Sequence, residues 1–597
     1  MIIVNMTIYS QRGNIHFSGD TAIIETSSLR MNGFEIREYY TGTTLDSVTI
    51  RNHITNTRLG RLYLNGGGTL EPDDDDTPEE PADSVSFIPF GTLFDNDLYT
   101  HNNAINGEYV GYFEYAKRDT INNKTFSFIT GNDNDIFAID TNGLITVAEP
   151  DSIDYATKGT YNLTVGLVFG TKADTADLTI NVYNPDNVIY IDFSSGSGGS
   201  GTFASPLNSL TGVTTADNKI YLCKRNTVET TSSSFECGND NVTVDAYGVG
   251  SLPKMTSSAA NGSKLINAGG SSDIIIRHLE VESTNNATTV VHWFNSDGGT
   301  IDRCKFHGSE WGIRANDDVL HTGKITIQHT EVYETGDDGL FLANVDSLHM
   351  FNNYVYDINQ KWFTDQSDGY SGGDCVQQGT NSWYKHEYNI YDHSSTGNKF
   401  ALIDFSPNAS GCKLENNVFI GPYLSDGGGC VYLTSVDSLE LYGNVIKGSI
   451  HGIYGPGATN MTAAYNVIKN IESGYGILVA NGLKAYNNVV DNVKYGMYTV
   501  NGNITSYNNI FINNNLGGYI YQGSTTRDYN LYYNNGDLVT PTGNELSSDP
   551  LFLQGYKIPT GSPAKDAGTS VGYSNDFFGN PVPFNGTVDI GIHEYNE

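Results

Sequence analysis

Short runs of alternating apolar and polar residues recur along the second half of the chain. Many begin with an asparagine followed by two or three apolar residues, as at Asn417-Val-Phe-Ile, Asn444-Val-Ile, Asn466-Val-Ile, Asn488-Val-Val and Asn509-Ile-Phe-Ile. These five asparagines are 21 to 27 residues apart. A fixed period of this size is typical of a solenoid built from one structural unit per repeat.

A second recurring phrase falls between the asparagines, and apolar residues alternate after it. It occurs as Trp311-Gly-Ile, Asp338-Gly-Leu, His451-Gly-Ile, Tyr475-Gly-Ile and Tyr495-Gly-Met. Each repeat thus holds two or three short strands of period two and no room for a helix, which predicts a coil of a parallel β-helix. We expect the asparagines to occupy one corner of successive coils, to take the left-handed backbone conformation there and to stack their side chains into a ladder.

The first third of the chain predicts three other segments. Residues 1–70 alternate in short runs broken by Gly and Asn, which indicates a small β-rich domain. Residues 71–83 are rich in Pro, Asp and Glu and form a linker, because they cannot bury a core. Residues 84–187 carry short alternating strands at regular spacing, as a β-sandwich does.

These patterns resemble known families. The asparagine repeats, the strand at Ile189-Tyr-Ile-Asp-Phe and the closing phrases Ser548-Asp-Pro-Leu and Asp589-Ile-Gly-Ile resemble the pectate-lyase-like superfamily, whose members include phage tailspike depolymerases and secreted polysaccharide-degrading enzymes. The resemblance implies a right-handed parallel β-helix over residues 188–544 and a capping segment over residues 545–597. The sandwich resembles a cadherin-like repeat, although Ala156 stands where that family has a calcium-binding Glu. The fold class expected is all-β.

Charge and composition narrow the function. The 68 acidic residues outnumber the 32 basic ones and give a formal charge of −36, so we expect no nucleic-acid partner. The first residues lack the features of a signal peptide, and no stretch is apolar enough for a membrane span. The six cysteines do not form a disulfide framework.

Acidic residues cluster when the coils are aligned on the second phrase. The alignment places acids from several coils along one face, followed by a lysine, and predicts five catalytic candidates: Asp337, Asp338, Asp374, Lys399 and His393. Two carboxylates can hydrolyse a glycosidic bond, with one as acid and the other as base or nucleophile. Alternatively, calcium and a basic side chain can carry out elimination on a uronate. Hydrolysis is slightly favoured.

A long insertion between Asn353 and Asn389 predicts a loop on the binding face, since extra residues of a solenoid coil protrude as loops. Aromatic rings and carboxylates in one loop suit a sugar ligand. The substrate-binding candidates are Glu310, Trp311, Trp362, Asp368, Tyr370 and Gln377. Asp365 and Asp368 are candidate calcium ligands; a hydrolase would require no cofactor.

The sequence therefore predicts a phage tailspike or receptor-binding protein that binds and cleaves a host surface polysaccharide. It would lie on the virion surface as a homotrimer, with residues 1–70 bound to a virion structural protein. The alternatives are a secreted bacterial polysaccharide lyase or hydrolase, which would be extracellular, and a glycan-binding adhesin without catalytic activity.

Overall fold

The computed structural model describes the backbone of strands within residues 4–52 and then residues 96–596, except for 114–123, 170–171, 197, 260–262, 285–288, 294–295, 359–372, 380–382, 393–400, 406–410, 422–428, 501, 522–524, 537–538 and 585. The chain divides into two compact units, Met1–Val85 and Ser86–Glu597. In the first unit, β3 pairs antiparallel with β2 and parallel with β5, and β1 pairs with β4. Its strands are β1 (Val4–Asn5), β2 (Gly13–Ser18), β3 (Thr21–Thr26), β4 (Arg37–Glu38) and β5 (Ser47–Asn52).

The second unit begins with a β-sandwich of cadherin-like fold. A four-stranded sheet in the order β6-β12-β11-β8 packs on a three-stranded sheet in the order β7-β10-β9, around a core that includes Phe113, Ile145, Val165 and Ile180. The strands are β6 (Asn96–Thr100), β7 (Tyr109–Tyr112), β8 (Lys124–Thr130), β9 (Phe137–Ile139), β10 (Leu144–Val147), β11 (Thr160–Phe169) and β12 (Lys172–Val182). Short 3₁₀ turns at Asp133–Asp135, Pro150–Ser152 and Pro185–Asn187 connect them to one another and to the next domain.

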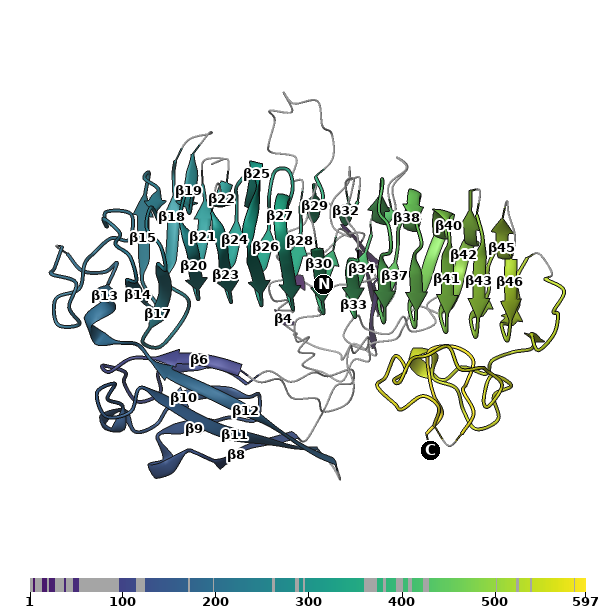
Figure 1. The fold of residues 1–597 in the computed structure, drawn as a ribbon, viewed down its shortest axis with the longest axis horizontal. Coiled ribbons are helices and arrows are strands. Elements are labelled where there is room, and N and C mark those ends of the chain that lie inside the picture. Colours follow the sequence, from purple (N-terminus) through teal and green to yellow (C-terminus); the bar gives the residue numbers. More distant parts are fainter. Residues whose placement is uncertain are drawn as a thin grey trace. The chain divides into compact units, whose positions relative to one another are not determined.

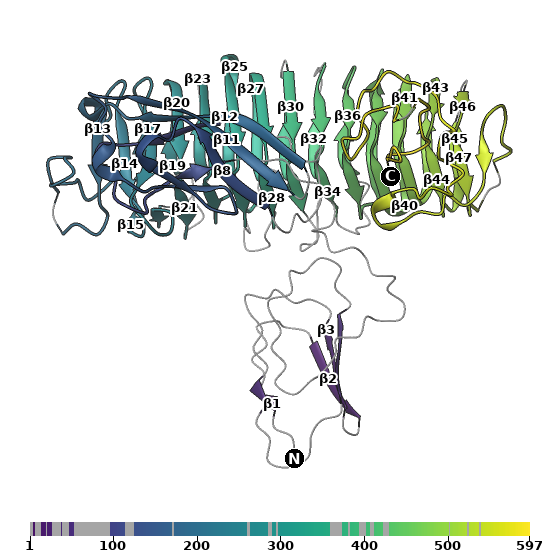
Figure 2. The same ribbon diagram turned by 90° about the horizontal axis from the view of Figure 1, so that it is seen from below.

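The remainder is a parallel β-helix whose strands form one 36-stranded sheet, stacked in chain order (Figures 1 and 2). The fold class predicted from the sequence is confirmed. The strands fall into three rows along the helix axis. The first row contains β13 (Val188–Ile191), β14 (Ile220–Lys224), β17 (Thr243–Tyr247), β20 (Ser272–Arg277), β23 (Asp297–Asp302), β30 (Trp383–Glu387), β33 (Lys413–Glu415), β36 (Glu440–Tyr442), β39 (Thr462–Ala464), β41 (Leu483–Tyr486), β43 (Ile504–Tyr507) and β46 (Thr525–Asp528).

The second row follows the first around each coil. It contains β15 (Val228–Thr231), β18 (Lys254–Ser257), β21 (Glu280–Ser283), β24 (Lys305–His307), β26 (Glu331–Tyr333), β28 (Tyr354–Tyr356), β31 (Ile390–Asp392), β34 (Val418–Ile420), β37 (Val445–Lys447), β44 (Ile510–Ile512), β47 (Leu531–Tyr533) and β48 (Leu546–Ser547).

The third row completes the coil and holds the candidate site. It contains β16 (Phe235–Glu236), β19 (Lys264–Asn267), β22 (Thr289–Trp293), β29 (Val376–Gln378), β32 (Ile403–Phe405), β35 (Gly429–Leu433), β38 (His451–Thr459) and β45 (Leu516–Tyr521). Four long strands bend from one row into the next: β25 (Trp311–Gln328) and β27 (Leu340–Phe351) join the third and first rows, and β40 (Val467–Asn481) and β42 (Val489–Thr499) join the second and third. A 3₁₀ turn, Gln554–Tyr556, lies in the C-terminal segment.

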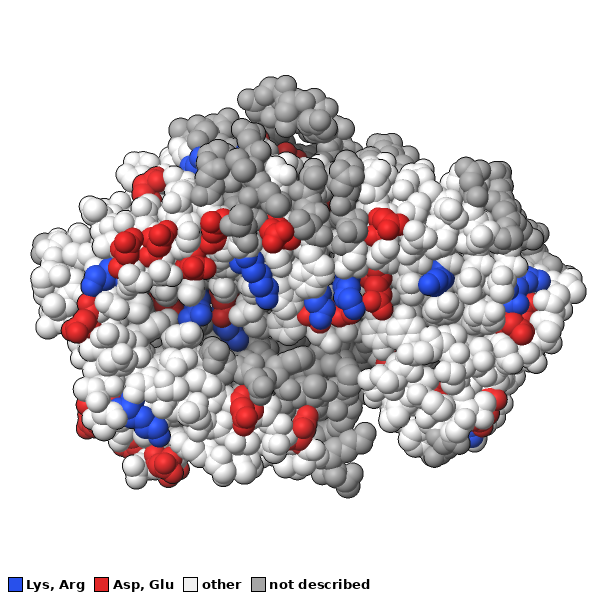
Figure 3. Space-filling view, in the orientation of Figure 1, with Lys and Arg blue, Asp and Glu red and all other residues white. Residues whose placement is uncertain are grey.

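The bore of the β-helix is apolar. Alternate residues of every row point inward, and fully buried rings from Tyr221 near one end to Phe511 near the other fill the interior. All six cysteines are buried and free, so no disulfide holds the coils together. Figure 3 shows that acidic and basic side chains on the face in view lie close together in a row along the β-helix. The charge on that face is therefore mixed rather than gathered into one acidic patch.

The predicted asparagine ladder is present at the corner between the first and second rows. Each Nδ2 donates to Oδ1 of the asparagine in the next coil, over distances of 2.8 to 3.1 Å. The ladder runs through Asn353, Asn389, Asn417, Asn444, Asn466, Asn488, Asn509 and Asn530. At its end, Asn530 donates to Oε1 of the buried Glu545 at 3.3 Å, so a carboxylate closes the row.

One expectation about this corner is wrong. The left-handed residue is the one before each ladder asparagine, with φ of 52° at Asn352, 58° at Asn416 and 66° at Gly443. Two adjacent residues therefore carry out the two tasks, turning the backbone and bonding to the next coil, that were predicted for a single asparagine. The first residue makes the turn, and the buried asparagine after it, with an ordinary backbone, satisfies the polar groups of neighbouring coils.

Candidate functional site

Two of the predicted catalytic acids, Asp338 and Asp374, lie on adjacent coils where the chain enters the third row. The backbone N–H of Asp374 donates to Oδ1 of Asp338 at 2.8 Å, and the N–H of Ala401 donates to Oδ1 of Asp374 at 2.8 Å. The two side chains are only 4% and 2% exposed. Each carboxylate thus accepts the backbone amide of the following coil, which is a structural role that ties three coils together.

The strand register corrects the alignment beyond Asp374. Val376 pairs with Ile403, and the amide bonded to Asp374 belongs to Ala401. The residue that follows Asp374 along the corner is therefore Ala401, two positions after Lys399. Insertions before β29 and β32 shift the register here, and the spacing of short phrases does not reveal such a shift.

The carboxyl group of Asp338 is held toward its neutral form. Burial raises its pKa well above the ordinary value for Asp, and the nearby charges of Asp337 and Asp374 raise it further. The hydrogen bond from the Asp374 amide opposes this effect without cancelling it. A carboxyl that keeps its proton above the usual range is what a general acid needs, although this one is nearly inaccessible.

Glu310, Trp311 and Asp337 lie next to this pair, half-buried. The N–H of Asp337 donates to the carbonyl oxygen of Glu310 at 2.9 Å, so the two acids are on neighbouring coils. The guanidinium of Arg314 lies 4.3 Å from the centre of the Trp311 ring and 5.6 Å from that of Phe341. Arg314 and Trp311 thus form a cation–π pair beside the acids.

Arg314 belongs to a row of outward-facing side chains along the third row of strands, which are labelled along the upper side of the β-helix in Figure 1. Strand pairing places one such residue on each successive coil. We call these residues the outer row: Arg314, Phe341, Gln377, Asp404, Tyr432, Tyr454, Leu478 and Tyr498.

Asp404 is the member of the outer row that the sequence analysis missed. It is 9% exposed, and its Oδ1 atom is buried without a hydrogen-bond partner in the part of the chain that the structure describes. Burial raises its pKa to about 6. The available signal was the short strand Ile403-Asp404-Phe405, where Ile403 packs in the core and the alternation turns Asp404 outward.

A stack of aromatic rings starts in the outer row and leaves it toward the C-terminus, passing to residues three positions earlier on the same strands. Ring centres lie 5.7 Å apart for Tyr432 and Tyr454 and 4.4 Å apart for Tyr454 and His451. The stack goes on from His451 to Tyr475 at 5.5 Å and from Tyr475 to Tyr495 at 4.9 Å. Rings this close and nearly parallel cover one another's faces, so the stack offers ring edges and hydroxyl groups along most of its length.

Of the remaining candidates, Gln377 lies in the outer row between Phe341 and Asp404. The others fall outside the described residues: Trp362, Asp365, Asp368, Tyr370, His393 and Lys399. Their proposed roles stay predictions. The structure thus brings Glu310, Trp311, Asp337, Asp338, Asp374 and Gln377 together at one end of the outer row.

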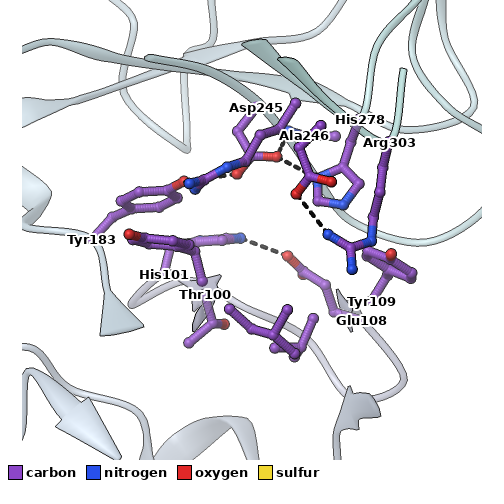
Figure 4. A pocket seen from close by; sticks show the side chains of 14 residues that line it. Thr100, His101, Glu108, Tyr109, Tyr183, Asp245, Ala246, His278 and Arg303 are labelled. Carbon is purple, nitrogen blue, oxygen red and sulfur yellow. Dashed lines mark hydrogen bonds and ion pairs between the residues drawn. The ribbon is translucent and has the colours of Figure 1, made fainter. Parts of the chain in front are cut away.

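A second polar region lies between the sandwich and the first coils of the β-helix (Figure 4). Asp245 accepts a hydrogen bond from Tyr183 at 2.7 Å and contacts Nδ1 of His278 at 2.6 Å, while His101 and Glu108 are 2.6 Å apart. Burial alone would raise the pKa of Asp245, but His278 and its hydrogen bond hold it at about 2. These side chains pair with one another within the protein, and the Tyr183–Asp245 hydrogen bond joins the end of the sandwich to the β-helix, which indicates an interdomain lock rather than a ligand site.

The described residues contain no group of three or more His, Cys, Asp or Glu side chains arranged to hold a metal ion. In the same part of the chain, no helix has the length and apolar character needed to cross a membrane.

Comparison with known proteins gives distant structural likenesses. No family model and no curated protein matches the chain. PfbA, a surface adhesin of Streptococcus pneumoniae, has 11% identity and a TM-score of 0.35, with 53% of this chain and 83% of that chain covered. The human desmocollin-1 ectodomain has 17% identity and a TM-score of 0.15. The match covers 21% of this chain and only 24% of that chain. Chicken VE-cadherin EC1-2 has 20% identity and a TM-score of 0.14, with 17% and 54% covered. The chain is thus a β-helix protein with a distant likeness to an adhesin.

Proposed function

We propose that the β-helix binds a polysaccharide along the outer row. The observation that carries this proposal is the unpartnered, buried Oδ1 of Asp404, between Gln377 on one coil and Tyr432 on the next. A buried acceptor without a donor is costly, so a ligand that supplies an O–H or N–H there gains a strong, charge-assisted hydrogen bond. Sugars are dense in such donors.

The dimensions of the row support a chain of sugars rather than a single one. From Arg314 to Tyr498 the row crosses seven strand spacings, or roughly 34 Å at about 4.8 Å per spacing. In the row or directly beside it lie a cation–π pair, an amide, a carboxylate and a stack of phenol and imidazole rings, which together present apolar edges and polar groups. A linear glycan parallel to the helix axis meets all of them.

The direct test is a glycan array followed by affinity electrophoresis of the full chain. Gln377→Ala should weaken binding by about fivefold, since it removes a polar contact of the kind that is worth about 1 kcal/mol. Asp404→Asn should weaken binding by about threefold or more, because it keeps an acceptor oxygen but removes the charge that strengthens the hydrogen bond. Asp217→Asn, which changes an exposed acid near the first coil, should bind like the wild type. Unchanged binding by both outer-row variants would move the site elsewhere.

Hydrolysis is the second candidate function, favoured by one specific observation. Asp404 has a pKa of about 6, and its charge also contributes to the raised pKa of Asp338. Two interacting carboxyl groups with different acidities suit an acid and its partner in glycoside cleavage. New reducing ends without absorbance from an unsaturated product would establish hydrolysis; both signals together would establish elimination; neither would leave a binding protein.

The setting we propose is the surface of a particle or cell. A receptor-binding protein of a phage, attached through residues 1–70 to a virion protein and assembled as a homotrimer, uses avidity to strengthen weak sugar contacts. A secreted enzyme and an adhesin are the alternatives. Light scattering on the full chain and on a chain beginning at Ser86, with a pull-down against virion structural proteins, separates them, because a monomer without a virion partner excludes the phage protein.

A further inference from the structure

The charges around Asp404 restrict the kind of glycan that the outer row can accept; this inference rests on the proposed function. The neighbours of Asp404 in the row, Gln377 and Tyr432, are uncharged. Burial raises the pKa of Asp404, and no cation among the described residues lowers it. Negative charge at this position is therefore uncompensated by the described side chains.

Arg314 is the basic residue of the described outer row that lies closest to Asp404 along the row. It lies three strand spacings away, or roughly 14 Å. Burial lowers the pKa of Arg314, and the nearby acids Glu310, Asp338 and Asp337 oppose this by favouring its charged form, so its positive charge is already matched by acids. Arg314 also stacks on Trp311. The carboxylate of a sugar brought to Asp404 would meet a second negative charge in a partly buried site, with no cation of the described outer row between the two.

We propose that the sugar unit at Asp404 bears no carboxylate and presents a hydrogen-bond donor, a hydroxyl or an ammonium group, to Oδ1. The glycan class is thus neutral or amino-sugar polysaccharide, and polyuronates are excluded from this position. A hydroxyl or ammonium satisfies the open acceptor, whereas a uronate carboxylate adds a second acceptor and a repulsive charge.

The two donors differ in pH dependence, which allows them to be distinguished. An ammonium group gains a charge pair only when Asp404 is ionised, so binding of an amino-sugar polymer should strengthen as the pH rises from 5 through the Asp404 pKa of about 6, and should weaken again once the amine itself loses its proton. A neutral glycan changes its affinity less over the same range, because a protonated carboxyl can still accept a hydrogen bond from a hydroxyl.

The experiment uses the full chain with three soluble polymers: dextran as the neutral probe, partly deacetylated chitosan as the cationic probe and polygalacturonate as the anionic probe. A glycan array adds further members of each class. We expect binders only in the neutral or cationic classes. For a neutral binder, Asp404→Asn should lower the affinity about threefold or more. For a cationic binder it should lower the affinity about tenfold or more at the pH of tightest binding, and the rise in affinity between pH 5 and that pH should disappear.

Two further variants sharpen the result. Gln377→Glu places a second carboxylate beside Asp404 and should strengthen cationic binding while weakening any residual anionic binding. Asp217→Asn controls for a general change in net charge and should alter no affinity. Acidic proteins attract any polycation, so chitosan binding alone does not test the proposal. The deciding result is whether Asp404→Asn weakens binding more than Asp217→Asn, which changes the net charge by the same amount.

Other outcomes overturn the proposal. Tight binding confined to anionic glycans, weakened by Asp404→Asn, would refute the assignment of the sugar class while leaving polysaccharide binding intact. Binding by no glycan of any class would refute both this inference and the proposed function. Binding of neutral or cationic glycans that is indifferent to Asp404→Asn and Gln377→Glu would place the sugar away from the outer row and also contradict the inference.

Discussion

The asparagine corner offers a sharp test of how the β-helix is stabilised, because Asn352 and Asn353 are adjacent, chemically identical and perform different tasks. Asn353 is 2% exposed, and its Nδ2 donates to the carbonyl oxygen of Ile327 at 2.8 Å. Its Oδ1 accepts from the N–H of Thr330 at 3.0 Å. Asn352 is exposed and left-handed, with φ of 52°.

Replacing each in turn should give unequal losses of unfolding free energy. Asn353→Leu keeps the side-chain size but leaves the N–H of Thr330 and the carbonyl of Ile327 buried without partners, at about 1 to 3 kcal/mol each, or about 2 to 6 kcal/mol in total. Asn352→Ala places a Cβ-bearing residue without a helpful side chain in the left-handed region, which costs about 1 kcal/mol. Asn352→Gly should cost close to nothing, because glycine adopts this conformation freely.

The assay is guanidinium denaturation of the full chain after reversibility has been checked. Solenoids can lose coils locally rather than all at once, so hydrogen exchange of the amides around Thr330 should accompany the denaturation. Asn353→Leu should speed exchange in the coils on both sides, and Asn352→Ala should not. Equal losses from the two variants, or a smaller loss from Asn353→Leu, would refute the division of tasks between the two asparagines.

Three further outcomes follow from the buried polar groups. The pKa of Asp338 is raised in the folded state, so its stabilising contribution is present at low pH and lost as the pH rises. Asp338→Asn should therefore raise the Tm at pH 8 and change it little at pH 4. A lower Tm at pH 8 would contradict this. Burial lowers the pKa of His292, His451 and His593 to about 4, so their contribution is present above pH 6.5 and lost as the pH falls to 4, and the Tm of the wild type should decline over that window more steeply than that of a variant with all three replaced by Gln. Glu545→Ala should cost about 2 kcal/mol, since it leaves Asn530 and the hydroxyl of Tyr532 without their acceptor; denaturation midpoints that match those of the wild type would count against a capping role.

The sequence predicted the β-helix because its repeat is carried by buried side chains. Asn417 to Asn509 recur at a spacing that the coil length enforces, and each missing amide would break two contacts. The left-handed position was assigned to the wrong residue because asparagine occupies both positions in several coils, as at Asn352-Asn353 and Asn416-Asn417, so the sequence alone does not distinguish them. Gly443, which stands before Asn444, held the missing clue, since glycine is favoured where φ is positive.

The candidate site was harder to predict because it depends on register between coils of unequal length. The acids that precede the recurring Gly-apolar phrase could be aligned from the sequence, and two of them, Asp338 and Asp374, do lie on adjacent coils. Past Asp374 the insertions move the register by two positions, and Ala401 takes the place assigned to Lys399. Asp404 escaped notice since it lies within a strand, one residue beyond the core position Ile403, rather than in a conspicuous loop.

The buried acids of the third row therefore separate into two kinds, and the separation decides where chemistry can occur. Asp338 and Asp374 accept backbone amides of the next coil, so their oxygens already serve the fold and substitutions there report first on stability. Asp404 faces outward from its strand, and its Oδ1 has no such partner in the described structure. Among the described residues this oxygen bonds to no neighbouring coil, which is why we propose it as the atom that a ligand meets. The charge of Asp404 contributes to the raised pKa of Asp338. A functional role for Asp338 would therefore depend on the protonation state of Asp404. Asp404 is accordingly the carboxylate at which binding and cleavage, if both occur, would meet.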